Sequence, residues 1–315
     1  MKWHLLLLAG IAISIFITYW RVASRPAFRQ QSNEVVIREP GKRSLGRPQP
    51  VAPEARTDME FAWLSQAAYQ RVPDGKKSGP AGCPDPDSAL QKIGWTRWLN
   101  FPDDELREKM STSHLRVEVW VNSSRNAVAV AFGGTVFKSG KDWKSNLRWF
   151  IPHHDDEYTE LVQEFGPAFV KEFVKRKEQP EWAFLQHTAI FATGHSLGGG
   201  LAQQFAYSLP IDPNVPRVKK VFAFDPSPVT GFYSLDATTR NTNSQNLAID
   251  RIYERGEVLA LLRSLENFVY PSSATSPTIR QVRYNLFYSH NPIAGHSIAE
   301  LTCKLDEVSR SCSVA

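Results

Sequence analysis

A serine flanked by glycines, between a strand pattern and a helix pattern, is the feature that most limits how this chain can fold. Residues 188–193 read TAIFAT, a short buried strand, and residues 197–209 have a helical pattern that Pro210 ends. Between them lies Gly194-His195-Ser196-Leu197-Gly198. A direct passage from strand to helix at a serine strains the backbone, so only very small residues fit two positions to either side. Because the helix N-terminus also stabilises negative charge beside the hydroxyl, the pattern predicts a nucleophilic Ser196.

The chain beyond residue 57 alternates strand patterns with helix patterns. Strands are expected at residues 114–122, 127–132, 188–193, 218–224 and 249–253, and helices at residues 59–69 with Asp58 as cap, 158–176, 197–209 and 298–305. The polar residues 236–246 are expected to form a surface loop. Alternation of this kind predicts an α/β domain over residues 57–315, with a mostly parallel central sheet flanked by helices.

The first twenty residues have the pattern of a transmembrane helix. Residues 3–20, WHLLLLAGIAISIFITYW, carry no formal charge when His4 is neutral, and eighteen helical residues span about 27 Å, about one hydrocarbon core. We therefore expect residues 1–20 to form a single-pass membrane anchor. The alternative is a signal peptide cleaved near Val22-Ala23-Ser24, which would remove residues 1–24 and export the rest. Arginines after the span favour a cytoplasmic domain, whereas the signal-anchor pattern favours export, so the side of the membrane stays open.

Residues 21–56 are expected to form a disordered tether between the anchor and the domain. Five prolines and scattered arginines leave this stretch without apolar periodicity. The three cysteines allow two states: Cys303 paired with Cys312 and Cys83 free in an oxidising compartment, or all three reduced.

The net charge of +5 comes from the N-terminal part of the chain. Residues 1–56 hold 9 Lys and Arg against 3 Asp and Glu, and the remainder holds 28 against 29. A domain with no excess of positive charge lacks what nucleic-acid phosphates require, so no nucleic-acid partner is expected. No cofactor motif is present, no metal site is expected, and the oligomeric state is left open.

Several segments besides the serine motif follow one family pattern. These are FAWLSQAAY (61–69), VAVAFGGTVF (128–137), Asp142-Trp143 with Asn146, GHSLGGGLAQQFA (194–206) and FDPSPVTG (224–231). Together they resemble the class 3 lipases, also called fungal-lipase-like, of the α/β-hydrolase fold, over about residues 57–305. The chain departs from that family at Gly133, where the usual R-G-T turn has arginine, and in the D-P-V-P segment, which lacks its aspartate.

The resemblance implies a catalytic triad in the chain order serine, acid, histidine. Only His290 and His296 follow Ser196, and His296 is the expected base because it lies just before the helix expected at 298–305. His290 is the alternative base.

The acid is expected to be Glu257, which stands with Val258 in the family's D-P-V place. Asp225, at the end of an earlier strand, is the main alternative, and Asp250 and Glu254 follow it. A glutamate can also orient the histidine and stabilise its charged form.

The oxyanion donors are expected to be the backbone N–H groups of Leu197 and Thr135. The resemblance thus implies a membrane-associated carboxylic ester hydrolase of the triacylglycerol lipase or phospholipase type, with a lipid or other ester as substrate. Two other functions fit the same residues: an acyltransferase or thioesterase using this triad, or an inactive hydrolase-like module that binds partners at a membrane.

Overall fold

The computed structural model describes residues 32–69, 80, 82–111, 113–134, 157–228, 230–256, 273–287 and 294–311. Within these residues, nine strands form one sheet: β1 (Glu34–Arg38), β2 (Pro48–Pro50), β3 (Thr96–Arg97), β4 (Arg116–Asn122), β5 (Ala127–Gly133), β6 (Ala189–His195), β7 (Val218–Phe224), β8 (Ala248–Glu254) and β9 (Thr278–Tyr284). The main helices are α2 (Ala52–Ala67), α3 (Pro86–Lys92), α4 (Asp104–Ser111), α6 (Glu157–Glu160), α7 (Gly166–Lys177), α8 (Leu197–Ser208), α9 (Ala237–Ser244) and α11 (Ile298–Ser311).

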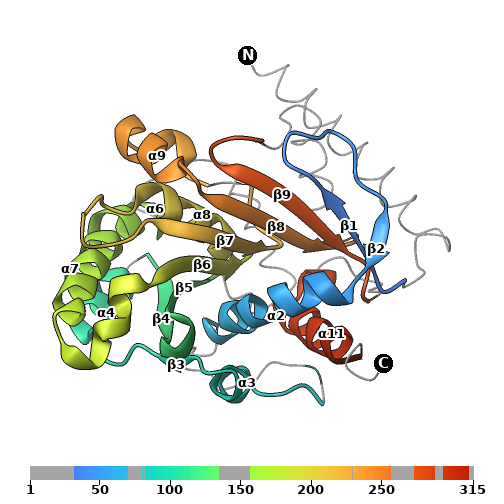
Figure 1. The fold of residues 1–315 in the computed structure, drawn as a ribbon, viewed down its shortest axis with the longest axis horizontal. Coiled ribbons are helices and arrows are strands. Elements are labelled where there is room, and N and C mark those ends of the chain that lie inside the picture. Colours follow the sequence, from blue (N-terminus) through green and yellow to red (C-terminus); the bar gives the residue numbers. More distant parts are fainter. Residues whose placement is uncertain are drawn as a thin grey trace.

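The strands lie in the order β2-β1-β9-β8-β7-β6-β5-β4-β3 (Figure 1). The five strands from β5 to β9 run parallel to one another, whereas β4 and β3 at one edge and β1 and β2 at the other are joined to the sheet by antiparallel pairing. This confirms the predicted α/β class with a mostly parallel central sheet flanked by helices. Strands buried on both faces are typical of such sheets, and every residue of β5 is buried.

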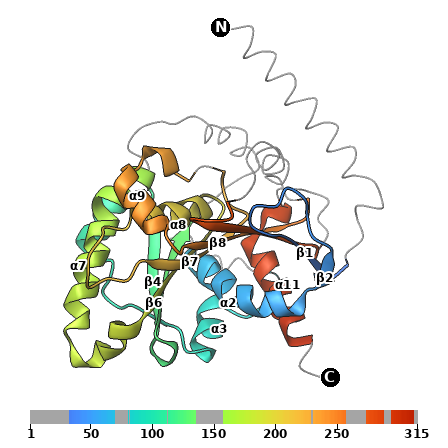
Figure 2. The same cartoon turned by 45° about the horizontal axis from the view of Figure 1, so that its top comes forward.

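Two apolar cores lie on opposite faces of the sheet. Side chains of β5 alternate between them: Val128, Val130 and Phe132 join a core with α4, α7 and α8, whereas the alanines between them face α2 and α11. The views in Figures 1 and 2 both show α2 and α11 side by side, in agreement with their extensive contacts. Because the alanine side chains of β5 are small, α2 can pack close to this face of the sheet.

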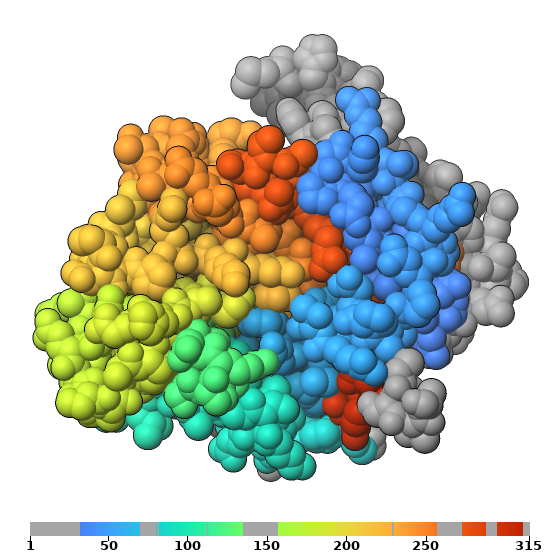
Figure 3. All heavy atoms as spheres, viewed as in Figure 1, coloured from blue at the N-terminus to red at the C-terminus, as the bar shows by residue number. Residues whose placement is uncertain are grey.

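The prediction of a disordered tether is wrong for the part of residues 21–56 that the structure describes. Val35 and Ile37 of β1 are buried, and the strand pairs with β9. Proline is tolerated at both ends of β2 because this strand lies at the edge of the sheet, where one side needs no ladder hydrogen bonds. Figure 3 shows these N-terminal residues (blue) packed against the C-terminal part of the chain (orange-red). A five-residue strand with three consecutive apolar residues and a three-residue strand with two prolines are too short to be predicted from their sequences.

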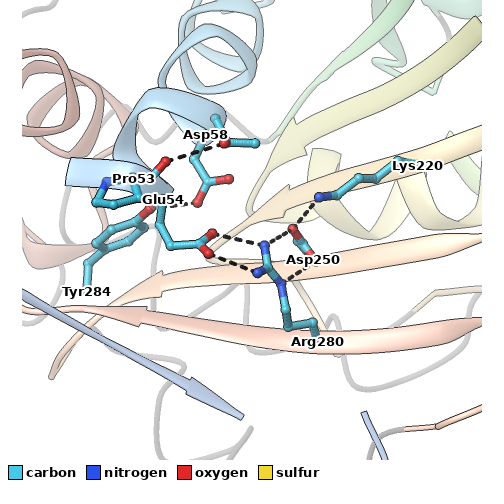
Figure 4. Close-up of polar contacts among 8 residues, drawn as sticks. Pro53, Glu54, Asp58, Lys220, Asp250, Arg280 and Tyr284 are labelled. Atoms are coloured by element: carbon cyan, nitrogen blue, oxygen red, sulfur yellow. Dashed lines mark hydrogen bonds and ion pairs between the residues drawn. The ribbon is translucent and has the colours of Figure 1, made fainter. Parts of the chain in front are cut away.

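The first described helix also begins earlier than predicted. It starts at Ala52 with Pro53 in its first turn, a favoured place for proline, rather than after a cap at Asp58. Asp58 is instead fully buried within α2 and accepts a 2.7 Å hydrogen bond from the Tyr284 hydroxyl of β9 (Figure 4). The loop expected at 236–246 contains a helix, α9, which Asp236 caps by accepting a hydrogen bond from the Thr239 amide.

Two predictions about the rest of the chain have different outcomes. Residues 1–20, the expected transmembrane helix, lie outside the described residues, and no helix among the described ones is long and apolar enough to cross a membrane. Neither cysteine state expected from the sequence is present, because Cys83 and Cys303 form a disulfide with their Cα atoms 5.7 Å apart. The two cysteines are separated by 220 positions, and only the packing of α11 brings them together.

Candidate active site

Ser196 occupies the turn between β6 and α8. Its backbone angles, φ 59° and ψ −122°, lie outside the regions that non-glycine residues normally adopt. Two backbone hydrogen bonds of 2.9 Å hold this strained residue against the end of β7: the Ser196 N–H donates to the Phe224 carbonyl, and the Ser227 N–H donates to the Ser196 carbonyl. The turn therefore has the strand-to-helix geometry that presents a serine hydroxyl above the sheet.

The glycines two positions either side of Ser196 are required by close backbone contacts. A Cβ atom at Gly194 would lie 2.2 Å from the Gly198 carbonyl oxygen, and one at Gly198 would lie 2.2 Å from the Phe132 carbonyl oxygen. Real Cβ atoms do not approach other atoms so closely. The spacing of the motif thus follows from the crossing of β6, α8 and β5 at this point.

His296 lies directly beside the serine hydroxyl. Its Nε2 atom is 3.0 Å from Ser196 Oγ, and both residues are buried. His296 ends a short 3-10 turn, Ala294–His296, immediately before α11, the position expected from the sequence. The alternative base, His290, lies outside the described residues.

Asp225 is the candidate acid that the structure brings to this histidine. It follows β7 with a left-handed backbone (φ 40°), and its carboxylate is fully buried. One Asp225 oxygen accepts a 3.3 Å hydrogen bond from the Glu254 amide. Asp225, His195 and His296 each have one side-chain atom within 4.8 Å of the corresponding atoms of the other two. Among the described residues, these three form the group whose spacing would also allow them to bind one metal ion. Glu257 lies outside the described residues.

The two weaker candidates for the acid have other partners. Asp250 binds Lys220 and Arg280, with closest distances of 2.7 and 2.6 Å. Glu254 is buried and accepts hydrogen bonds from the Leu286 amide on both carboxylate oxygens. Burial raises the pKa of Glu254 to about 8, and the nearby charge of Asp225 adds to this rise.

Tyr69 and His195 lie at the serine turn, and the sequence did not single them out as site residues. The Tyr69 hydroxyl lies 3.0 Å from His195 Nδ1 and donates a 3.1 Å hydrogen bond to the His195 carbonyl. His195 Nε2 lies 3.8 Å from an Asp225 oxygen, and its ring centroid lies 4.7 Å from that of His296. Only the positions of these residues in the sequence could have indicated them: His195 directly precedes Ser196, and Tyr69 is the last residue of the family-like segment 61–69.

The expected oxyanion donors are only partly described. Leu197 begins α8, and the first N–H groups of a helix have no partner within the helix. Thr135 lies outside the described residues. The turn that leads to it does approach the serine turn, because a Cβ at Gly134 would lie 2.6 Å from the His195 carbonyl oxygen.

Gly133, where the resembled family has arginine, is packed too tightly for a side chain. A Cβ atom there would lie 2.9 Å from the Ala68 carbonyl oxygen and 3.1 Å from the Arg116 Cβ. In this chain the backbone after α2 therefore occupies the space that a side chain at 133 would need.

No family model matches the chain, and no curated protein matches it. Solved structures similar to it are fungal lipases. The triacylglyceride lipase of Rhizomucor miehei has 15% identity and a TM-score of 0.46 over 72% of this chain and 77% of that chain. The lipase of Rhizopus microsporus var. chinensis has 14% identity and a TM-score of 0.42 over 75% and 73%. In the native propeptide complex of the Rhizomucor enzyme, the match spans 64% of that chain and 70% of this one, with 15% identity and a TM-score of 0.42.

Proposed function

We propose that this chain is a serine hydrolase that cleaves carboxylic esters. The observation that carries the proposal is the 3.0 Å contact between His296 Nε2 and Ser196 Oγ, made on a strained and buried strand-to-helix turn. A serine hydroxyl is a weak nucleophile alone, and an imidazole at this distance activates it by accepting its proton.

The reaction follows from the placement of these groups. His296 takes the hydroxyl proton as Ser196 Oγ attacks the ester carbonyl, and the N–H of Leu197 stabilises the negative charge that develops on the carbonyl oxygen. We expect the N–H of Thr135 to be the second donor. His296 then gives the proton to the departing alcohol, which leaves an acyl-enzyme on Ser196. Water, deprotonated by His296, attacks this ester and releases the acid and the free serine.

We assign the acid of the triad to Asp225. Its buried carboxylate lies beside His296, and its left-handed backbone is an unusual conformation of the kind that clusters at functional sites. A carboxylate in this place holds the imidazole in orientation and stabilises its charged form. Glu257 stays the alternative expected from the sequence.

We further propose that the substrate is a lipid ester and that residues 1–20 anchor the enzyme in a membrane. The support is the uncharged span at residues 3–20 and the resemblance of residues 57–305 to class 3 lipases. The Cys83–Cys303 disulfide supports an exported domain, because disulfides persist in oxidising compartments. Protease added to right-side-out plasma-membrane vesicles that carry the protein should therefore digest the domain. Protection of the domain would place it in the cytoplasm.

Fluorophosphonate labelling tests the reaction directly. We expect the probe to modify the peptide that contains Ser196, and we expect Ser196→Ala to lose both labelling and ester hydrolysis while keeping its circular dichroism spectrum. Product analysis with a phospholipid, a triglyceride and an acyl-thioester then separates lipase, phospholipase and thioesterase activity. An unlabelled wild-type protein beside a labelled control hydrolase would reject the mechanism and favour an inactive interaction module.

A further inference from the structure

Tyr69 touches the two turns on which the proposed reaction depends. Its hydroxyl contacts both the carbonyl oxygen and the Nδ1 atom of His195, the residue before the nucleophile. Gly134, in the turn after β5, lies against the same hydroxyl, because a Cβ atom built there would be 2.3 Å from the hydroxyl oxygen. One oxygen atom thus links the serine turn to the turn that leads to the expected second oxyanion donor.

The hydrogen-bonding capacity of the hydroxyl fits this set of partners. A phenolic hydroxyl has one proton to donate, and the His195 carbonyl can only accept, so the O–H donates to that carbonyl. The oxygen then accepts a hydrogen bond from His195 Nδ1 in the tautomer that carries its proton on this atom. Burial raises the pKa of Tyr69 well above its usual range, so the hydroxyl stays protonated and continues to donate to the His195 carbonyl near neutral pH.

The segment that carries Tyr69 is itself fixed to the sheet. One helical turn earlier, the Ser65 hydroxyl lies 2.7 Å from the Thr193 hydroxyl of β6. The Thr193 hydroxyl oxygen also lies 3.1 and 2.9 Å from the Phe61 and Phe222 carbonyl oxygens, either of which can accept its proton. These buried contacts tie α2 to the strand that ends at the serine turn, so Tyr69 projects from a rigid support.

Gly134 fits against Tyr69 because it has no side chain. A Cβ atom at Gly134 would lie 2.3 Å from the Tyr69 hydroxyl oxygen and 2.6 Å from the His195 carbonyl oxygen. The three residues therefore form a close-packed junction with no space between the two turns.

We propose that Tyr69 is a positioning residue that fixes the distance between the serine turn and the Gly134 turn; this inference rests on the proposed function. In this fold the oxyanion is stabilised by one N–H after the nucleophile and one from the loop that follows the strand equivalent to β5. Such donors are effective when they are held in place before the reaction begins. Tyr69 supplies that rigidity without touching the substrate.

The test compares Tyr69→Phe with Tyr207→Phe in the full chain. Both variants remove one hydroxyl and keep the ring, but Tyr207 lies near the far end of α8, about 16 Å along the helix from Ser196. We expect Tyr69→Phe to lower kcat for a soluble ester by about 10- to 100-fold, with KM within about twofold of wild type, and to slow fluorophosphonate inactivation equally. Tyr207→Phe should leave all three values unchanged.

The outcomes separate this inference from the proposed function. If wild type is active and Tyr69→Phe has the same kcat, or if the two variants lose activity equally, the positioning role is overturned and the function stands. A wild type that neither hydrolyses esters nor reacts with the probe overturns both. Gly134→Ala provides a second variant, because its methyl group would displace the hydroxyl and should lower kcat while leaving KM unchanged.

Discussion

Ser196 and Asp225 both have positive φ angles, 59° and 40°, at the ends of the neighbouring parallel strands β6 and β7. Each such conformation costs about 1–3 kcal/mol and persists only where the surrounding structure enforces it. Here the hydrogen bonds from Ser196 to the Phe224 carbonyl and from Ser227 to the Ser196 carbonyl join the two strand ends. The same backbone hydrogen bonds therefore maintain the strained conformations of both residues.

The first prediction concerns the identity of the acid. Because Asp225 lies beside His296, Asp225→Asn should lower kcat for ester hydrolysis by about 10⁴-fold, as loss of the orienting carboxylate does in other triads. Glu257→Gln is the matched variant and should cost less than about tenfold on the same scale. Steady-state kinetics on a soluble ester measure both. A larger loss in Glu257→Gln would return the role to the residue expected from the sequence.

The second prediction concerns where the folded domain begins. A chain lacking residues 1–31 keeps β1, β2 and α2 and should fold to a soluble, active protein. A chain lacking residues 1–56 loses both strands, the first turn of α2 and the ion pair between Glu54 and Arg280, so it should aggregate. Gel filtration and circular dichroism of the two proteins provide the measurement. Equal solubility and activity would show that the N-terminal strands are dispensable.

The third prediction concerns the Cys83–Cys303 disulfide. It joins the segment before α3 to α11, the helix that follows His296, and closes a separation of 220 residues. Cys83→Ser and Cys303→Ser should each lower the free energy of unfolding by about 2–5 kcal/mol, and a reductant should have little further effect on either variant. Urea unfolding with and without reductant measures this. Cys312→Ser is the control, and a loss of stability there with none in Cys83→Ser would support the other pairing.

The central part of the fold was predictable from sequence because its signals are local. Apolar runs bounded by turn residues located β5, β6 and β7 within one or two residues, and the glycine spacing located the turn at Ser196. Such runs are longer than those expected by chance from the overall amino-acid composition. The short helices α3 and α4, the strand β9 and the N-terminal strands were not predicted, because their sequences are short, polar or interrupted by proline.

The parts of the site that were missed depend on tertiary contacts. Tyr69 and His195 meet across 126 positions, and Cys83 meets Cys303 across 220. The spacing of residues in the sequence does not indicate contacts between positions so far apart. Asp225 was recognised only as the alternative acid, because the family pattern directs attention to the segment after the next strand, where Glu257 lies.

The fourth prediction concerns Asp58, a buried carboxyl group of α2. Asp58 is fully buried next to the ion-pair cluster of Glu54, Arg280, Asp250 and Lys220 (Figure 4). Burial raises its pKa from 3.8 to about 7, and the charge of Asp250 adds to the rise, while the hydrogen bond from Tyr284 opposes it. The folded protein therefore holds this proton at a pH where the unfolded chain has already released it.

The sign of the effect on stability follows from that difference. Binding the proton more tightly in the folded state stabilises it fully below about pH 4, and this contribution is lost as pH rises through about 7. Asp58→Asn carries no charge at residue 58 at any pH. The free energy of unfolding of the variant, relative to that of wild type, should therefore rise by roughly 4 kcal/mol between pH 4 and pH 8. Urea unfolding at several pH values measures this. Tyr284→Phe removes the hydrogen bond that favours the charged form of Asp58, so its free energy of unfolding should fall further below that of wild type at pH 8 than at pH 4. If the free energies of unfolding of wild type and Asp58→Asn change with pH in parallel, Asp58 does not titrate in this range.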